Sequence, residues 1–398
     1  MHEQLADGVH WFGVVDWGIR HFHGHELSTH RGTTYNAYLI RDEKTALVDT
    51  VWDPFADEFL ARLRKTVDLA DIDYIVANHA EPDHSGTLPA LVRECPNATI
   101  VVSKKGAESI PGHYHEPWNF QTVGTGDRIS LGQRELLFVE APMLHWPDSM
   151  FTYLAPDGIL MPNDAFGQHY ATAYRFNDQV DQDELYEEAL KYYVNILTPF
   201  SPLVAKKIDE LLGLGLLVEM IAPSHGVLWR DEPLQIVRKY QEWAAQKGEV
   251  RAVVLYDTMW QATRRMAEAI GEGLRAEGVP YKLLHMSLTD RNDALVELFR
   301  SRGIVIGSPT LNNGLLPTVM PIMEDLRGLK FRNKVGAAFG SYGWSGEGVG
   351  LIEKHFETCK IPLAAEGVLA KWQPTEEDLA RCRDLGRAVA AKVKNPSG

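Results

Sequence analysis

From residue 251 onward, short apolar runs alternate with amphipathic stretches, and this alternation limits the possible folds more than any other feature of the sequence. Runs rich in β-branched residues predict strands, and the stretches between them predict helices. Strict alternation is typical of parallel strands joined by helices, which form a doubly wound α/β sheet. The expected strands are 251–256, 281–286, 303–307 and 334–339, and the expected helices are 261–277, 293–302, 318–326 and 348–358.

The first part of the chain has a different pattern, in which strands dominate. At 398 residues the chain is too long for one ordinary domain, and the polar stretch 245–249 offers a natural boundary. We therefore expect two domains, 1–248 and 249–398. In the first, the expected strands include 34–41, 44–49, 72–78, 99–103, 135–140 and 159–162, and the expected helices include 55–66, 86–95 and 183–195.

The composition argues against several classes of partner. A formal charge of -14 would repel a phosphate backbone or an anionic lipid surface, so nucleic acid and membrane are not expected. The longest apolar stretch, 211–223, is shorter than the roughly 20 residues that span a bilayer. The start of the chain does not resemble a signal peptide, and three widely spaced cysteines do not predict a disulfide framework. We expect a cytoplasmic protein.

A short segment after the strand expected at 72–78 concentrates metal-binding side chains. His79, Glu81, Asp83 and His84 lie within six residues, and we expect Pro82 to keep this segment out of a helix. Gathering imidazoles and carboxylates costs stability unless a cation holds them together. The segment therefore predicts a metal site.

Further candidates follow later strand-like segments, namely His145, Asp164 and His225. Seven ligands exceed what one metal needs but suit two metals that share a bridging carboxylate and keep open positions. For His23 and His25 two interpretations are open: they are either turn residues or groups that lie beside the metals and contact their ligands.

The order of these residues resembles the metallo-β-lactamase superfamily. Hydrolases of that superfamily usually have His-x-His-x-Asp-His, whereas this chain has Glu81 at the place of the second histidine. An anionic oxygen makes the site harder and more negative than an imidazole does, which favours iron over zinc.

Three turns follow expected strands of the second domain, at the sheet edge where open α/β sheets bind ligands. In the first turn, hydroxyl groups and the free amides of a helix start suit a single phosphate, and neither dinucleotide nor nucleoside-triphosphate motifs are present. The set resembles a flavodoxin, with FMN held by one phosphate loop and two ring loops. The candidate FMN residues are Thr258, Met259, Trp260, Gln261, Ala262, Thr263, Ser308, Pro309, Thr310, Leu311, Asn312, Asn313, Gly340, Ser341, Tyr342, Gly343, Trp344 and Ser345.

Together, the two constellations resemble the flavodiiron proteins, or A-type flavoproteins, over essentially the whole chain, including 31–36, 144–150 and 163–168. The resemblance implies an α+β metallo-β-lactamase-like αββα sandwich followed by an α/β flavodoxin-like doubly wound parallel sheet. It implies FMN, two non-haem irons and the reduction of O2 to water, of NO to N2O, or of both, scavenging these molecules in an anaerobic or microaerobic cell. By family analogy, His79, Glu81 and His145 bind one iron, Asp83, His84 and His225 bind the other, and Asp164 bridges them.

The resemblance also implies partners. Reduced FMN and a diferrous pair together store the four electrons that O2 requires. We expect a separate rubredoxin-like electron donor, because the chain stops after the flavodoxin half. We also expect a head-to-tail homodimer, possibly a dimer of dimers, with the flavin of one subunit facing the irons of the other. His23 and His25 are candidate proton or hydrogen-bond donors.

Two other functions remain open from the residues. One is a dinuclear zinc hydrolase with a flavodoxin-like docking module, which Glu81 disfavours. The other is an electron carrier or redox sensor that uses FMN alone. The metal and flavin content distinguishes the reductase from the hydrolase. Alanine replacement of Asp83 or His84 that leaves O2 and NO consumption intact would favour the carrier. The sequence does not predict whether O2 or NO is the preferred substrate.

Overall fold

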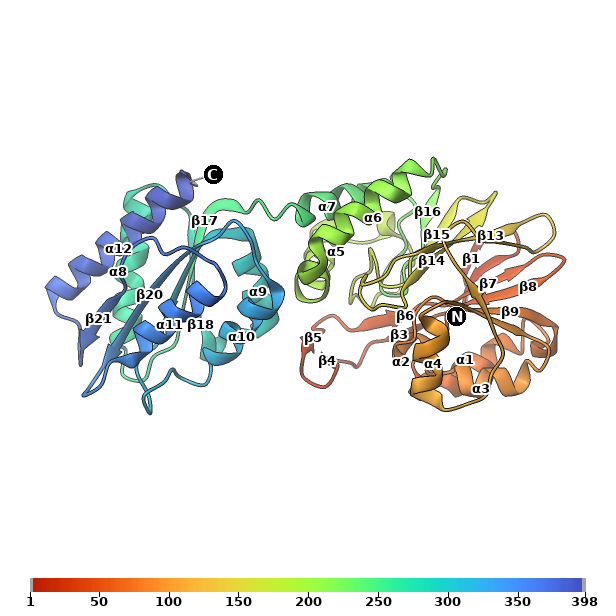
Figure 1. Cartoon of the computed structure of the whole chain (residues 1–398), viewed down its shortest axis with the longest axis horizontal. Coiled ribbons are helices and arrows are strands. Elements are labelled where there is room, and N and C mark those ends of the chain that lie inside the picture. Colours follow the sequence, from red (N-terminus) through yellow and green to blue (C-terminus); the bar gives the residue numbers. More distant parts are fainter. Residues whose placement is uncertain (1–2, 396–398) are drawn as a thin grey trace. The chain divides into compact units, whose positions relative to one another are not determined.

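The computed structural model describes residues 3–395, which form two compact units (Figure 1). One contains the chain up to residue 193 together with 200–244, and the other contains 194–199 and the chain from 245 onward. The domain limits at 248 and 249 stay a prediction, since residues 245–248 group with the second unit.

Two sheets form the centre of the first unit, and their apolar faces enclose a core that includes Val48, Val76, Phe138 and Leu154. The first sheet contains, in order, β1 (Glu3–Ala6), β2 (Val9–Trp11), β7 (Tyr38–Arg41), β8 (Thr45–Val48), β9 (Ile72–Ala77), β10 (Thr99–Ser103) and β11 (Phe120–Val123). In this sheet, β8 to β11 pair in parallel and continue the antiparallel strands. The second contains β12 (Arg128–Ser130), β13 (Glu135–Glu140), β14 (Met150–Ala155), β15 (Ile159–Met161) and β16 (Met220–Ile221). Two short antiparallel pairs are β3 (Val14–Asp16) with β6 (Thr33–Tyr35), and β4 (His21–Phe22) with β5 (Leu27–Ser28).

Helices cover the outer faces of both sheets, so the unit is an αββα sandwich (Figure 1). Each covering helix buries one apolar stripe, as α1 does with Phe59, Leu60 and Leu63. Beyond the first sheet lie α1 (Ala56–Leu63), α3 (Leu88–Glu94) and α4 (Gly106–Tyr114), and beyond the second lie α5 (Gln182–Tyr192), α6 (Ser201–Gly213) and α7 (Leu234–Ala244).

One expectation about this unit is wrong. Pro82 does not keep its segment out of a helix, because Pro82 begins the single helical turn α2 (Pro82–Ser85). Proline suits the first helical position, where its fixed φ is helical and its missing N–H has no intrahelical partner to lose. The turn places Asp83 and His84 on consecutive helical positions.

The second unit is a five-stranded parallel sheet with helices on both faces. The strands are β17 (Glu249–Tyr256), β18 (Tyr281–His285), β19 (Ser301–Gly307), β20 (Val335–Tyr342) and β21 (Val368–Lys371), in the spatial order β18-β17-β19-β20-β21. The helices are α8 (Ala262–Ala276), α9 (Arg291–Arg300), α10 (Met320–Leu329), α11 (Glu347–Thr358) and α12 (Glu376–Lys394). This topology confirms the flavodoxin-like class, and β21 and α12 were not among the expected elements.

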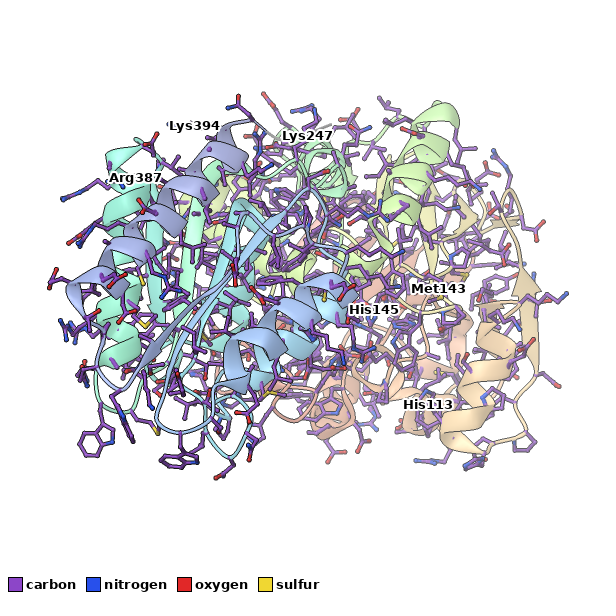
Figure 2. The ribbon with its side chains drawn as sticks, turned by 60° about the vertical axis from the view of Figure 1, so that its left-hand side comes forward. His113, Met143, His145, Lys247, Arg387 and Lys394 are labelled. Carbon is purple, nitrogen blue, oxygen red and sulfur yellow. The ribbon has the colours of Figure 1, made fainter. Side chains whose placement is uncertain are left out.

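Glycines let α8 and α12 approach closely. A Cβ added to Gly386 would lie 2.2 Å from the carbonyl oxygen of Ile270, and one added to Gly273 would lie 2.1 Å from that of Arg383. Arg387 and Lys394 project from the outer part of α12 (Figure 2). None of the helices within residues 3–395 is both long enough and apolar enough to cross a membrane.

Candidate metal centre and flavin pocket

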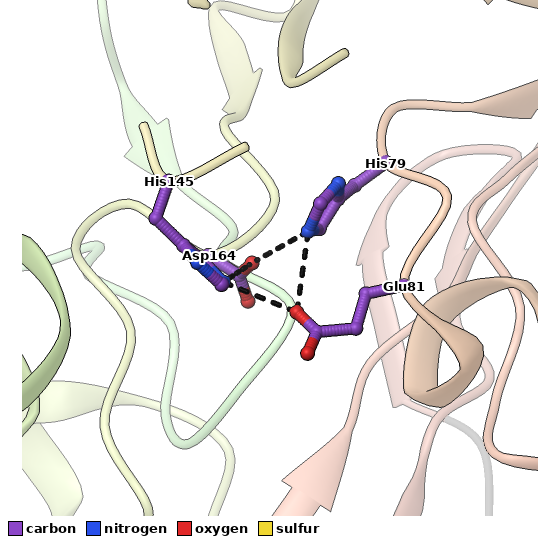
Figure 3. Close-up of side chains that lie close together, drawn as sticks. All are labelled: His79, Glu81, His145 and Asp164. Carbon is purple, nitrogen blue, oxygen red and sulfur yellow. Dashed lines mark hydrogen bonds and ion pairs between the residues drawn. The ribbon is translucent and has the colours of Figure 1, made fainter. Parts of the chain in front are cut away.

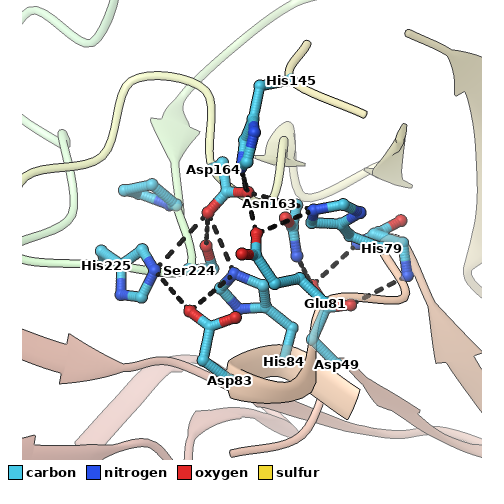
Figure 4. A network of polar contacts seen from close by, with 12 residues as sticks. Asp49, His79, Glu81, Asp83, His84, His145, Asn163, Asp164, Ser224 and His225 are labelled. Carbon is cyan, nitrogen blue, oxygen red and sulfur yellow. Dashed lines mark hydrogen bonds and ion pairs between the residues drawn. The ribbon is translucent and has the colours of Figure 1, made fainter. Parts of the chain in front are cut away.

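The seven predicted metal ligands converge from four segments of the first unit (Figure 4). Each segment follows a strand, so the ends of neighbouring strands bring together residues that lie far apart in the sequence. The segments after β9, β13, β15 and β16 contribute side chains that are 12% exposed or less. The residues are His79, Glu81, Asp83, His84, His145, Asp164 and His225.

Four of these residues form a first cluster (Figure 3). Nε2 of His79 lies 3.3 Å from Oε2 of Glu81 and 3.7 Å from Oδ2 of Asp164. Nε2 of His145 lies 3.1 Å from the same glutamate oxygen and 3.2 Å from the same aspartate oxygen. The four donor groups therefore face one small volume.

The second cluster shares Asp164. Nε2 of His84 lies 3.2 Å from Oδ2 of Asp83 and 3.0 Å from Oδ1 of Asp164. Nε2 of His225 lies 3.1 Å from Oδ2 of Asp83 and 3.5 Å from Oδ1 of Asp164. One oxygen of Asp164 thus faces each cluster, which is the arrangement of a bridging carboxylate.

The spacing of the donor atoms fits two metal ions. Metal-to-ligand distances of about 2.0–2.2 Å place neighbouring ligands about 3.0–3.5 Å apart around a tetrahedral or octahedral ion. Most of the distances within the two clusters fall in this range, from 3.0 Å to 3.5 Å, and the largest is 3.7 Å. Within the described part of the chain, Oδ1 of Asp83 and Nδ1 of His84 are buried without a hydrogen-bond partner.

The electrostatics of the clusters also fit cations. Burial alone lowers the pKa of His84, but the charges of Asp83 and Asp164 outweigh burial and raise that pKa to about 9. Burial likewise lowers the pKa of His145, and its contacts with Asp164 and Glu81 raise it to about 9. In the metal-free protein, protons on these rings supply the positive charge that metal ions would otherwise supply. The clusters therefore favour positive charge both without metal ions and with them.

Several supporting groups were missed by the sequence analysis. Oδ2 of Asp148 lies 3.2 Å from Nδ1 of His79 and accepts a 2.6 Å hydrogen bond from the backbone N–H of Ala80. Nδ1 of His225 lies 2.6 Å from the carbonyl oxygen of Thr34. These contacts leave Nε2 of each ring for a metal. Asp148 stands in the 144–150 segment, but only the folded geometry identifies its role.

The hydroxyl group of Tyr192 was also missed. It donates a 2.9 Å hydrogen bond to Oδ1 of Asp164 and comes from the last position of α5. This contact holds the shared carboxylate in its orientation between the clusters.

The two candidate proton donors occupy different environments. Nε2 of His23 lies 2.8 Å from Oε1 of Glu81, and its side chain is 38% exposed. Burial lowers the pKa of His23, but its hydrogen bond and the charge of Glu81 raise it above 6.5 overall. His25 instead packs against the ring of His21, 4.8 Å between centroids, on the exposed turn between β4 and β5.

In the second unit, the three predicted flavin loops surround a cavity of about 620 Å³, a size that suits a cofactor. All the candidate residues line it except Gln261, Thr263, Ser308 and Gly340. Trp372 and Gln373, which follow β21, form a further wall that the sequence analysis missed because β21 itself was not expected.

The cavity has the features that FMN requires. It opens beside the N-terminal end of α8, where free backbone N–H groups attract a phosphate. The hydroxyl oxygen of Thr258 is buried and has no hydrogen-bond partner among the described residues, so it is available to a phosphate oxygen. The rings of Trp344 and Trp372 lie 6.3 Å apart at the wall and offer flat apolar surfaces.

Comparison with known proteins identifies a family for each of the two units. The sequence model of a family described as ODP family beta lactamase matches residues 33–226, and that of flavodoxin matches residues 254–386. A nitric oxide reductase of Moorella thermoacetica is 51% identical over 391 residues, covering 98% of both chains. The anaerobic nitric oxide reductase flavorubredoxin of Klebsiella pneumoniae is 49% identical over 97% of this chain and 81% of its own. The structure of rubredoxin oxygen:oxidoreductase from Desulfovibrio gigas superposes with a TM-score of 0.97 at 38% identity, covering 99% of each chain.

Proposed function

The chain belongs to the flavodiiron protein family, and from this premise we propose that it reduces NO to N2O, O2 to water, or both, at two irons supplied with electrons by FMN. The observation that carries this conclusion is the pair of buried clusters that share Asp164, with Glu81 among the ligands. Two clusters bind two redox-active metals side by side, and a separate cavity suits the flavin.

We propose the following ligands. His79, Glu81 and His145 hold one iron, Asp83, His84 and His225 hold the other, and Asp164 bridges them. When bound, the irons supply electrons and Lewis acidity, and FMN stores two further electrons.

The surrounding residues orient these ligands. Asp148 accepts a hydrogen bond from Nδ1–H of His79, and the carbonyl group of Thr34 accepts one from Nδ1–H of His225. Both rings therefore present Nε2 to the metals. Tyr192 restrains Asp164 through its hydroxyl group. The ligands therefore keep their geometry while substrate binds and leaves.

His23 is proposed to bring protons to the site. Its ring bridges Glu81 and the solvent, because Nε2 contacts the carboxylate while 38% of the side chain is exposed. A raised pKa keeps more of the ring protonated near neutral pH. His25 is proposed as a more distant donor, next to His21 on the same turn.

The flavin loops are proposed to hold FMN by its phosphate and by its ring. Thr258 and the start of α8 bind the phosphate, and the loops after β19 and β20 bind the ring. Trp372 adds an aromatic wall to this set.

The decisive experiment combines composition with anaerobic kinetics. We expect roughly two irons and one FMN per chain, and rapid reoxidation of the reduced protein by NO, by O2 or by both. Zinc without flavin, together with hydrolysis of an ester or amide, would favour the hydrolase instead. Separate mixing with each gas measures the preference between them.

The electron donor and the assembly are also proposals. A rubredoxin-type donor is suggested by the names of the relatives from Klebsiella pneumoniae and Desulfovibrio gigas. A head-to-tail homodimer is suggested by the exposed apolar side chains of Met259, Trp260 and Trp344 at the rim of the flavin pocket. Light scattering during size exclusion should give a dimer or a dimer of dimers, and a fully active monomer would refute this assembly.

A cytoplasmic location is proposed as well. Cys95 and Cys382 are buried as free thiols, and Cys359 is unpaired too, which suits a reducing compartment. Cell fractionation with a compartment marker tests this location.

A further inference from the structure

A series of aromatic rings that includes tryptophan and tyrosine runs outward from the first metal cluster. The ring centroid of Trp146 lies 4.9 Å from that of His79 and 6.0 Å from that of His145. His113 stacks on Trp146, with ring centroids 6.0 Å apart and an interplanar angle of 14°. Figure 2 labels His113 on α4 and His145 in the loop after β13.

The series continues to the surface. The centroid of Tyr114 lies 6.0 Å from that of His113, and that of Trp118 lies 5.9 Å from that of Tyr114. Tyr114 and Trp118 are both only part-buried. We call Trp146, His113, Tyr114 and Trp118 the α4 arm.

A second, shorter series leaves the other cluster. The ring of Tyr35 lies 6.0 Å from that of His225 and 6.0 Å from that of Trp52. Tyr35 is fully buried, whereas Trp52 is 37% exposed. We call Tyr35 and Trp52 the Trp52 arm. Both arms thus begin at a predicted ligand and end at a tryptophan that solvent reaches.

We propose that the two arms carry oxidising equivalents from the metal centre to surface tryptophans when O2 reaches a protein that holds too few electrons. Indole and phenol side chains lose an electron far more easily than other side chains without sulfur, and electron transfer becomes steeply slower with distance. Rings in contact therefore direct the oxidation outward and spare the metal ligands. This inference rests on the proposed function, because the oxidant is the substrate O2.

The electrons balance as follows. Four electrons convert O2 to two waters, and a diferrous pair supplies two of them when FMN is oxidised. The two missing electrons move inward, one at a time, from Trp118 or Trp52. A tryptophan that takes up one water molecule and loses two electrons and two protons becomes hydroxytryptophan. Its protons pass to the solvent, which supplies those that the reduction of O2 consumes.

Trp17 provides a matched control within the same unit. Its side chain is 58% exposed, more than that of Trp52, and among the described residues it has no ring contact with either arm. Oxidation by species diffusing in solution would follow exposure and favour Trp17. Oxidation through the arms would favour Trp118 and Trp52.

The experiment maps oxidation by peptide mass spectrometry. The holoenzyme receives two electrons per chain anaerobically, is mixed with O2, and is digested, and a sample given four electrons is treated in parallel. We expect several-fold more oxygen addition at Trp118 and Trp52 than at Trp17, and only in the under-reduced sample. In Trp146→Phe, oxygen addition at Trp118 should fall to the level of Trp17 and that at Trp52 should persist.

Two results would overturn the inference. One is oxygen addition that increases with the exposed fraction of each tryptophan side chain, and the other is oxidation of Trp118 that is unchanged in Trp146→Phe. Tyr114→Phe keeps a ring in the α4 arm but removes its oxidisable hydroxyl group, so it tests the same arm if Trp146→Phe loses iron. A reduced holoenzyme that consumes no O2 would refute the proposed function, whereas O2 consumption without patterned oxidation would refute only the arms.

Discussion

Replacing Asp148 by Asn should weaken the first metal position selectively. Oδ2 of Asp148 faces Nδ1 of His79 at 3.2 Å and also accepts the N–H of Ala80 at 2.6 Å. An amide can keep its oxygen at this position, but it carries no negative charge, and its NH2 group then replaces Oδ1, which is buried without a hydrogen-bond partner among the described residues. A buried donor left without an acceptor costs about 1–3 kcal/mol, and loss of a carboxylate behind a ligating histidine typically lowers metal affinity about 10–100-fold.

The assay is anaerobic competition for Fe(II) with a calibrated chelator. We expect the affinity of one of the two irons to fall about 10–100-fold, while the iron held by Asp83, His84 and His225 changes little. Asp178→Asn is the matched control, because that carboxylate pairs with Arg230 at the surface, 2.9 Å between its Oδ2 and the guanidinium Nη2. An Asp148→Asn variant with unchanged iron affinity, or an equal loss at both irons, would refute the reasoning.

Three further predictions concern packing, pH and the flavin. Gly386→Ala should destabilise the protein by about 1–3 kcal/mol, since its Cβ would lie 2.2 Å from a backbone oxygen of α8. Gly350→Ala in α11, where a Cβ meets nothing within 4 Å, should instead stabilise it by about 0.5–1 kcal/mol. Denaturant unfolding of both variants checks this pair, and equal effects would contradict it. The pKa values of about 9 for metal-free His84 and His145 mean that each iron displaces a proton from one of these rings, so the apparent affinity for each iron should rise roughly tenfold per pH unit below 9. Iron titration between pH 6.5 and 8 with a proton-release indicator measures this slope, and a flat profile would count against it. Thr258→Val should weaken FMN binding about tenfold, because it removes one hydrogen bond to a charged group, and should leave riboflavin binding nearly unchanged. Flavin fluorescence titrations measure both affinities, and an equal loss for FMN and riboflavin would contradict the prediction.

Periodicity and motif order were enough to predict much of the fold. Strand and helix alternation after residue 251 predicted four of the five parallel strands, since buried parallel strands appear as continuous apolar runs. The fifth, β21, has only four residues, too few to stand out from a loop. The helix that follows does carry a start signal, because Thr375 and Asp378 form a capping box before an apolar repeat.

The convergence of the candidate ligands was predictable for a different reason. Histidines and carboxylates that follow separate strands share one sheet edge once the strands pair, and their types already limit the metal. Orientation could not be predicted in this way. The roles of Asp148, Thr34 and Tyr192 depend on which atom faces which ring across gaps of 28 to 191 residues, and a sequence contains no signal for such contacts.

The helical turn at Pro82 illustrates the same limit. Proline both interrupts helices and begins them, and the choice depends on the residues that follow and on their tertiary contacts. Here the turn is also held by Ser85, whose hydroxyl group donates to the carbonyl oxygens of Ala80 and Glu81. Such a contact exists only in the folded loop.

Anomalous-scattering crystallography at the iron edge tests the central claim most directly. It should reveal two irons, one contacting His79, Glu81 and His145, the other contacting Asp83, His84 and His225, with Asp164 between them. A single metal, a zinc signal in place of iron, or an aspartate that touches only one ion would contradict the account.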